Sequence, residues 1–201
     1  MEEKKKKIYA FDFDGTITTR DALIAFIILT RGSWRLAQWM MCHLPWLVLM
    51  KMRLYSNHHL KEQLFQDMFG GMPYEKMLGV SNDFAESHKD IIRHDAINII
   101  EKAIREGDTV AIVSASPEIW VRPFFREYEG IMFLCTRLET DNGLVTGHFT
   151  GSNCYGPEKV SRLKEAFPER DGYHLIAFGD SRGDREMLEF ADEGYFRKLK
   201  H

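Results

Sequence analysis

Two aspartates stand two positions apart at the end of an apolar run, in the segment Phe11-Asp-Phe-Asp-Gly-Thr16. Side chains alternate along a strand, so Asp12 and Asp14 would start on the same side. Gly15 allows a sharp turn directly after them, which keeps both carboxylates near one reacting centre. Two carboxylates this close repel each other unless a cation or a shared proton relieves the repulsion. In isolation the pair is more often a polar strand end with two solvated acids, so its interpretation depends on the rest of the chain.

Polar side chains also follow two later apolar runs, which end at Val113 and Phe178. Ser114 comes directly after the first run, and the segment Gly179–Asp184 comes directly after the second. The carboxyl ends of parallel strands share one edge of an open sheet, and ligands bind there. Five side chains that are far apart in the sequence are therefore expected at one edge: Asp12, Asp14, Ser114, Asp180 and Asp184.

The composition is that of a soluble globular protein. The 201 residues are enough for one well-buried domain, or for a core with a modest insertion. A net charge of -3 argues against a general nucleic-acid-binding protein. The three cysteines are odd in number and contain no Cys-x-x-Cys pair, which predicts neither a disulfide framework nor a zinc site and favours a reducing cytoplasm.

The basic cluster Lys4 to Lys7 is expected to be a solvated N-terminal arm, with contact to anionic lipid as the alternative. No long apolar stretch follows it, so no secretory signal is predicted.

From about Asp95 onward, helical and strand-like segments alternate, which predicts a parallel sheet with helices on both faces. Beside the first strand, which begins at Ile8, strands are predicted over 109–113, 131–135 and 173–178, and a hairpin over 137–150 with Asp141-Asn142-Gly143 as its turn. Helices are predicted over 96–106, 116–128, 157–167 and 184–190, and Ser116 is expected to cap the second of these.

The stretch from Thr19 to His94 has helical periodicity and no strand signals. It predicts a helical insertion that stands over the strand ends as a lid. Its helices are expected over 21–30, 33–55, 57–69 and 73–89. The predicted organisation is therefore a core made of 1–18 and 95–201, and a helical cap made of 19–94.

Two blocks of this insertion, 22–29 and 39–50, are unusually apolar. A membrane span needs roughly 20 predominantly apolar residues, and charged residues and Pro45 interrupt these blocks. Buried lid helices are the first interpretation. A helix at the membrane surface is the second, because tryptophans favour a headgroup boundary and three occur here: Trp34, Trp39 and Trp46. The expected location is therefore the cytoplasm. Association with a membrane surface is the alternative, and no membrane-spanning helix is expected.

Together these segments resemble the haloacid dehalogenase superfamily of aspartate-nucleophile phosphatases. The resemblance covers residues 8–14 and 95 to about 196, and its four motifs occur in order. They are Asp12-Phe-Asp14-Gly-Thr16, then Ser114, then Lys159, and finally Gly179-Asp180 with Asp184. The resemblance implies a Rossmann-like three-layer α/β core with a parallel sheet, and an all-helical cap inserted after the first strand.

An insertion at this place is similar to the branch that contains phosphoserine phosphatases and bacterial phosphatidylglycerophosphate phosphatases. The segment Asn153-Cys-Tyr-Gly-Pro-Glu-Lys159 is more similar to the second group. A Mg²⁺-dependent phosphatase that hydrolyses a phosphate monoester is the implied activity.

The resemblance implies a role for each motif residue. Asp12 is the nucleophile that forms an aspartyl-phosphate, and Asp14 is the acid for the leaving alkoxide and then the base for water. Mg²⁺ is held by Asp12, Asp180 and the backbone carbonyl of Asp14. The phosphate is bound by Ser114, Ala115 and Lys159. The supporting positions are Asp184, Thr16 and Gly183, and Thr16 is expected to close the turn by bonding the backbone.

The residue at position 14 also distinguishes two reaction classes of the family that this chain resembles. Family dehalogenases keep the nucleophile but lack an acid two residues later, since a leaving halide needs no proton. Its presence here favours hydrolysis of a phosphate ester.

The substrate is expected to be a small-molecule or lipid phosphate ester, with Asp21 and Lys61 as candidates for specificity. In phosphoserine phosphatases a lid arginine holds the serine carboxylate, and Lys61 cannot reproduce that bidentate contact. The apolar, tryptophan-rich lid suits a substrate with an apolar part. The alternatives are a phosphoserine phosphatase-like enzyme, a phosphotransferase, and a non-catalytic binding module.

Overall fold

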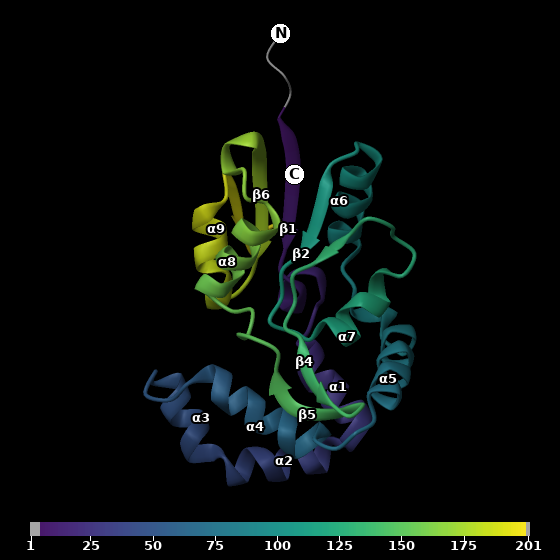
Figure 1. Ribbon diagram of the computed structural model, residues 1–201, viewed down its shortest axis with the longest axis vertical. Helices are drawn as coiled ribbons and strands as arrows, with labels where there is room; N and C mark the ends of the chain where they lie inside the picture. Colours follow the sequence, from purple (N-terminus) through teal and green to yellow (C-terminus); the bar gives the residue numbers. More distant parts are fainter. Residues whose placement is uncertain (1–4, 200–201) are drawn as a thin grey trace.

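A five-stranded parallel sheet, in the order β3-β2-β1-β6-β7, lies at the centre of the computed structural model (Figure 1). The structure describes residues 5–199. Each strand pairs in parallel with its neighbours, which confirms the predicted fold class. The strands are β1 (Lys6–Phe11), β2 (Thr109–Ile112), β3 (Met132–Phe133), β6 (Tyr173–Gly179) and β7 (Glu193–Phe196).

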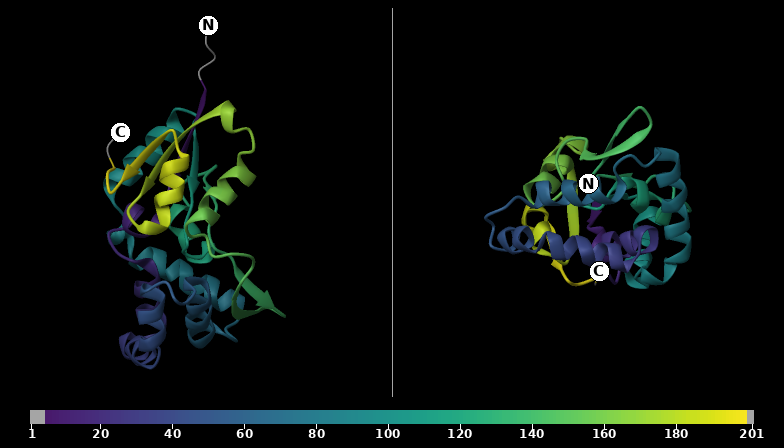
Figure 2. Two further views of the ribbon diagram at one scale, coloured as in Figure 1. Left: turned by 90° about the vertical axis from the view of Figure 1, so that its left-hand side faces the viewer. Right: turned by 90° about the horizontal axis from the view of Figure 1, so that it is seen from below.

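Alternate residues of β1 pack into two separate cores on opposite faces of the sheet. Tyr9 and Phe11 belong to the core that contains the apolar face of α6 (His94–Arg105). Ile8 and Ala10 belong to the core of α8 (Pro157–Ala166) and α9 (Arg185–Phe190). This two-residue period produces the three predicted layers, with α8 and α9 on one face and α6 on the other (Figure 2).

The N-terminal arm differs from the prediction. Lys4 lies outside the described residues, but Lys6 and Lys7 are the first residues of β1, where they pair with Tyr173 and His174 of β6. The strand extends further than its apolar run because β6 supplies ladder partners for it.

Five helices occupy the insertion between β1 and α6 and are called the cap below. They are α1 (Ala22–Arg31), α2 (Ser33–Cys42), α3 (Leu44–Lys51), α4 (Asn57–Phe69) and α5 (Tyr74–Ser87). The single helix predicted over 33–55 is wrong. It is divided at His43, two residues before Pro45 in the first turn of α3, and it ends before Arg53, whose φ is 65°. Within residues 5–199, no helix is long and apolar enough to cross a membrane.

The predicted hairpin is confirmed and lies against the cap. Strands β4 (Leu138–Asp141) and β5 (Leu144–Phe149) are joined by Asn142 and Gly143, both with positive φ, as in a type I′ turn. The backbone N–H of Phe149 donates to the Glu62 carboxylate of α4 at 2.9 Å. A Cβ on Gly147 would lie 2.3 Å from Cα of Gln66, so only glycine permits this close approach.

The helix predicted over 116–128 forms only in part. It consists of α7 (Glu118–Val121), which continues as a 3-10 turn over Arg122–Phe125 that contains Pro123. Proline has no N–H for a helical hydrogen bond, which limits a regular helix here. Other short helical turns cover Phe13–Ile17, Lys89–Ile91, Arg170–Gly172 and Arg182–Asp184.

Candidate active site

The carboxyl ends of β1, β2 and β6 meet at one sheet edge, beneath the cap. Asp12 directly follows β1, and its backbone N–H continues the ladder by donating to the carbonyl of Phe178 at 2.9 Å. Asp180 directly follows β6. Both aspartates line a cavity of ≈ 470 Å³ that reaches from the sheet edge into the cap. The predicted gathering of distant residues at this edge is therefore what the structure shows.

A buried lysine joins two of the aspartates. Lys159, in the first turn of α8, donates from Nζ to Oδ1 of Asp12 at 2.5 Å and to Oδ1 of Asp184 at 2.6 Å. Its side chain is only 2% exposed. Although burial alone would lower the pKa of Lys159, the two carboxylates raise it above its ordinary value. This lysine is a fixed positive charge beside Asp12.

Three carboxylates could hold a cation. Oxygens of Asp12, Asp180 and Asp184 all lie within 4.8 Å of one another. Oδ1 of Asp180 is buried without a hydrogen-bond partner. Burial raises the pKa of Asp12 to about 7, partly offset by Lys159, and burial and the nearby Asp184 also raise the pKa of Asp180. Carboxylates that repel one another, with one oxygen unsatisfied, fit a hard divalent cation such as Mg²⁺.

Asp14 is held apart from that group. Its Oδ1 accepts from the backbone N–H of Ala22 at 2.6 Å, and its Oδ2 accepts from the hydroxyl of Ser116 at 2.6 Å. Burial, together with the nearby Asp21 carboxylate, raises the pKa of Asp14 to about 6. This carboxyl can therefore exchange a proton near neutral pH, while its backbone stays beside Asp12.

Gly15 and Thr18 shape the turn that presents these aspartates. Gly15 has a φ of 78°, and a Cβ there would lie 2.4 Å from Oδ2 of Asp180. Glycine is therefore needed at this position both for the backbone conformation and because the loop that carries Asp180 approaches it closely.

The expected role of Thr16 is wrong. Its buried hydroxyl has no hydrogen-bond partner, and Thr18 closes the turn instead. Thr18 Oγ1 accepts from the N–H of Gly15 at 3.1 Å and donates to the carbonyl of Arg20 at 2.7 Å. The turn over Phe13–Ile17 is wider than an ordinary β-turn, which shifts the closing side chain by two residues.

The loop after β6 is built around Asp184. Its Oδ2 accepts from the backbone N–H groups of Asp180 and Ser181 and from the Ser181 hydroxyl, at 3.2, 2.9 and 2.8 Å. Gly183 supports the same loop, since a Cβ there would lie 2.4 Å from the ring of Tyr155. Asp184 therefore fixes the loop that carries Asp180 while its other oxygen binds Lys159.

Of the predicted phosphate-binding and specificity positions, Ala115, Lys159, Asp21 and Lys61 line the same cavity, whereas Ser114 is fully buried next to Ala115 and does not line it. The buried Ser114 hydroxyl accepts from the N–H of Ser116 at 3.0 Å, which leaves its own hydrogen free to donate. Lys61 donates to the carbonyl of Ala115 at 2.7 Å, and burial lowers the pKa of this lysine. Asp21 lines the cavity and caps α1 by accepting from the N–H of Ile24 at 3.2 Å.

Sequence reasoning missed two residues of this site. Ser116 was predicted to cap a helix, but its hydroxyl bonds Asp14 instead. Asn153 accepts from Lys61 at 3.4 Å and from Thr136 at 3.1 Å. The repeated serine in Ser114-Ala-Ser116 was the available signal for the first. For the second it was the segment Asn153–Lys159, which carries part of the resemblance, although no role was assigned to Asn153 itself.

The cap supplies an apolar wall to the cavity. Six of its lining side chains are apolar residues of α1 to α4: Leu23, Trp39, Leu47, Met50, Leu60 and Leu64. Trp39 is fixed there by a hydrogen bond of 2.8 Å from its indole N–H to Asp67. The cavity thus has carboxylates at the sheet end and hydrocarbon at the cap end.

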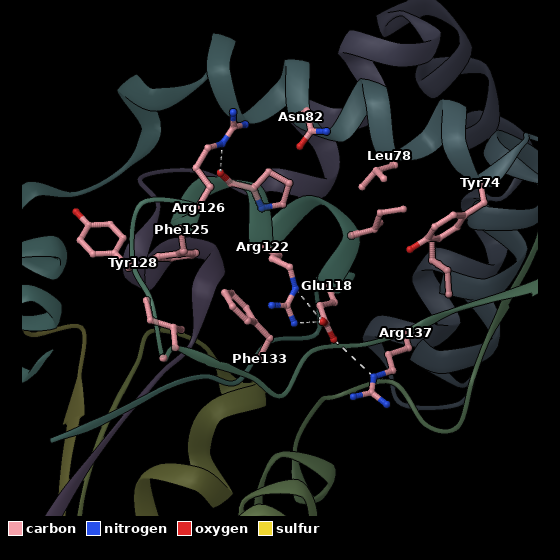
Figure 3. A pocket seen from close by; sticks show the side chains of 15 residues that line it. Tyr74, Leu78, Asn82, Glu118, Arg122, Phe125, Arg126, Tyr128, Phe133 and Arg137 are labelled. Carbon is pink, nitrogen blue, oxygen red and sulfur yellow. Dashed lines mark hydrogen bonds and ion pairs between the residues drawn. The ribbon is translucent and has the colours of Figure 1, made fainter. Parts of the chain in front are cut away.

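A larger cavity, of ≈ 650 Å³, lies between α5, α7 and β3 and contains none of these carboxylates (Figure 3). Its charges already have partners, because Glu118 pairs with Arg122 and Arg137, and Arg122 stacks at 4.3 Å on the ring of Phe133. A further group that could hold a metal, His58, His59 and Glu62, lies on α4 and does not line the cavity that contains Asp12 and Asp180. The chemistry is therefore expected at the sheet edge.

Comparison with known proteins places the chain in a family. The family model described as haloacid dehalogenase-like hydrolase matches residues 9–189. Protein CicA of Caulobacter vibrioides is 32% identical over 195 residues, which cover 94% of this chain and 85% of that protein. The family-model match includes Asp12, the cap and the loop that carries Asp180 and Asp184.

Solved structures share the fold at low identity. A Bordetella pertussis protein of unknown function has a TM-score of 0.78 and 17% identity, and the match covers 94% of this chain and 88% of that one. A phosphoserine phosphatase with an analogue of its phospho-aspartyl intermediate has a TM-score of 0.62 and 19% identity, with coverage of 94% and 84%.

Proposed function

The chain belongs to the haloacid dehalogenase-like hydrolase family, and within that family we propose that it is a Mg²⁺-dependent phosphatase that hydrolyses a phosphate monoester through an aspartyl-phosphate. One observation carries the proposal. Asp12 and Asp14 lie at the same end of the cavity, yet one is bound to a buried lysine and the other to a hydroxyl and a backbone N–H. Two carboxylates with such different partners suit two different roles.

Asp12 is proposed as the nucleophile. Lys159 favours its ionised form and would also attract a phosphate oxygen. A carboxylate oxygen of Asp12 attacks phosphorus, the P–O bond to the alcohol breaks, and the electron pair leaves with the alkoxide oxygen. The phosphate would be oriented by the Ser114 hydroxyl and by the backbone at Ala115.

Asp14 is proposed as the acid and base. Its raised pKa, about 6, lets a useful fraction carry a proton, which it gives to the leaving alkoxide. The resulting carboxylate then takes a proton from the water that attacks the aspartyl-phosphate, and inorganic phosphate leaves. Ser116 and the N–H of Ala22 hold this carboxyl in place through both steps.

Asp12, Asp180 and the Asp14 carbonyl would hold Mg²⁺, with Asp184 in support. When bound, the ion supplies charge neutralisation between the anionic nucleophile and the anionic phosphate. The unpartnered Oδ1 of Asp180 is the feature of this chain that most favours such an ion.

We further propose a substrate whose alcohol part is apolar, such as a lipid-type phosphate ester. The hydrocarbon wall of the cavity supports this, and Lys61 and Asp21 at the cavity rim would contact polar groups of the substrate. The cap would comprise 19–94, accompanied by the hairpin on α4, and the core 1–18 and 95–201.

Hydrolysis of p-nitrophenyl phosphate with and without Mg²⁺ tests the proposal. Mg²⁺-dependent release of phosphate, with phosphate trapped on Asp12 in rapidly quenched samples, is the expected result. Turnover that persists with an excess of EDTA, or phosphate trapped elsewhere, would contradict it. Phosphate transfer that requires an added alcohol would point to a phosphotransferase instead.

A further inference from the structure

Helices α2 and α3 and the turn after them carry many large apolar side chains that are exposed to solvent. Of α2, only Leu36 and Trp39 are buried, and none of the residues of α3 is buried. These helices form the end of the molecule opposite the N-terminal strand (Figures 1 and 2). The exposed apolar residues are Trp34, Met40, Met41, Leu44, Trp46, Val48, Met52 and Leu54, and together with Lys51 and Arg53 they are called the α2–α3 face.

This exposure is concentrated in one part of the chain. Trp34 is 73% exposed, Met41 76% and Leu54 68%. Eleven of the fifteen exposed large apolar side chains among the described residues lie between Ile24 and Leu54. Scattered apolar side chains need no explanation, but a concentration on neighbouring helices indicates a surface that is covered by something else.

The charge of the same segment limits what can cover it. No aspartate or glutamate occurs from Ala22 to Lys61, whereas the whole chain carries a net charge of -3. Five lysines and arginines lie in that stretch, and of these Lys51 and Arg53 are exposed and form no ion pair with any residue in the described range 5–199. Tryptophan and methionine beside unpaired cations match the boundary of a bilayer with anionic headgroups.

We propose that the α2–α3 face rests on the surface of an anionic phospholipid bilayer without crossing it. A second copy of this chain fits less well, because a two-fold contact would bring Lys51 and Arg53 of both copies into one interface without a compensating carboxylate. The two short helices meet at His43 and lie along the end of the cap, as a surface-bound pair requires.

The same helices connect this face to the catalytic cavity. Trp39, Leu47 and Met50 of α2 and α3 line that cavity, while neighbouring side chains of the same helices are exposed to solvent. A lipid-type phosphate ester could therefore pass from the bilayer to the carboxylates along the apolar wall. This link to the substrate rests on the proposed function, but binding of the bilayer itself does not.

Sedimentation with vesicles tests the proposal. The full chain should bind vesicles that mix phosphatidylglycerol with phosphatidylcholine, and the emission of Trp34 and Trp46 should shift to the blue. Pure phosphatidylcholine should bind less, and added salt should weaken binding to the mixed vesicles. Absence of binding to mixed vesicles, or equal binding to both lipids, would overturn the proposal.

Two variants and a control locate the contact. Trp34→Ser with Met41→Ser removes apolar area, and Lys51→Glu with Arg53→Glu reverses charge; each should reduce binding about tenfold or more. Leu144→Ser removes an exposed apolar side chain of the hairpin and should bind as the unaltered chain does. Circular dichroism verifies that each variant is folded, and equal losses in all variants would contradict this location.

Activity and mass separate the remaining outcomes. None of the four substituted residues lines the catalytic cavity, so both variants should hydrolyse soluble p-nitrophenyl phosphate at the rate of the unaltered chain. Vesicle binding without any hydrolysis would leave this inference standing and contradict the proposed function. A dimer in light scattering that dissociates in the Trp34→Ser and Met41→Ser variant, with no vesicle binding, would assign the face to self-association instead.

Discussion

Ser116 donates a hydrogen bond of 2.6 Å to Asp14, across 102 positions of sequence. The bond joins the loop after β2 to the loop after β1, and it ends on the carboxyl proposed as the proton donor. A donated hydrogen bond stabilises the ionised form of a carboxyl and so lowers its pKa, against the effect of burial.

Ser116→Ala should therefore move the pH profile. Asp14 must be protonated for the first step, so kcat/KM should fall as the pH rises through its pKa, about 6. Without the hydroxyl the pKa rises, and this alkaline limb should move to higher pH by roughly one pH unit, since a hydrogen bond to a charged group contributes about 1.5–3 kcal/mol. Ser152→Ala, at an exposed serine, is the matched control, and a limb that does not move in Ser116→Ala would contradict the role of Ser116.

Asp12→Asn should abolish turnover without unfolding the protein. The change removes the nucleophile and keeps the side-chain volume, so a loss of about 10³-fold or more in kcat is expected. The substitution also removes one of the two carboxylates that pair with the buried Lys159, which can lower the stability of the fold. The thermal midpoint of the variant is therefore measured in parallel. Asp171→Asn makes the same substitution at an exposed site and should retain full activity. A folded Asp12→Asn protein with wild-type kcat would exclude the aspartyl-phosphate mechanism.

The loss of activity in Asp14→Asn should depend on the leaving group of the substrate. An alkyl phosphate needs its oxygen protonated and should lose about 10²–10⁴-fold in kcat/KM. p-Nitrophenolate is a better leaving group, so the loss for its ester should be smaller. Kinetics on both esters with the same variant give the comparison, and equal losses would count against Asp14 as the acid.

Mg²⁺ should raise the thermal midpoint of the unaltered protein. The ion would bind the folded chain among Asp12, Asp180 and Asp184, and a ligand at 100 times its Kd adds about 2.7 kcal/mol to the free energy of unfolding. For a chain of this size that corresponds to several degrees, about 2–4 °C per kcal/mol. Asp180→Asn should lose most of this increase and EDTA should reverse it, whereas Asp171→Asn should keep it. An undiminished increase in Asp180→Asn would place the ion elsewhere.

Local patterns predicted most of the core. Apolar runs located β1, β2 and β6, and Asn142-Gly143 located the hairpin turn. The strand β7 was missed because Glu193-Gly-Tyr-Phe196 has no apolar run, and its position depends on pairing with β6. A strand that is defined mainly by its neighbour leaves little trace in its own residues.

Spacing in the sequence brought the aspartates together correctly, but it could not assign hydrogen bonds. Whether Thr16 or Thr18 closes the first turn depends on backbone angles that the residue types do not fix. The partner of Ser116 lies in the turn after another strand, and only the fold decides whether the hydroxyl bonds Asp14 or a helix end. The contact between the hairpin and α4 is likewise long-range, although Gly147 marks it once the structure is known.

The apolar wall of the cavity should favour a substrate with an apolar body through KM. Buried apolar area contributes about 25 cal/mol per Å² before the costs of binding, and a short polar ester cannot draw on it. A lysophosphatidate or phosphatidylglycerophosphate should therefore show a lower apparent KM than phosphoserine or glycerol phosphate. Leu47→Ser and Met50→Ser each remove part of this wall.

If each of these substitutions removes roughly 50 Å² of apolar contact with the substrate, KM for the lipid esters should rise by up to about tenfold. KM for glycerol phosphate should stay unchanged. Leu144→Ser, outside the cavity, should change neither value. Substrates are presented in detergent micelles below saturation of the surface, so that binding to a bilayer does not enter the comparison. A clear preference for phosphoserine, or equal effects of Leu47→Ser on both kinds of ester, would show that the wall packs the cap and does not bind substrate, while the roles of Asp12 and Asp14 would stand.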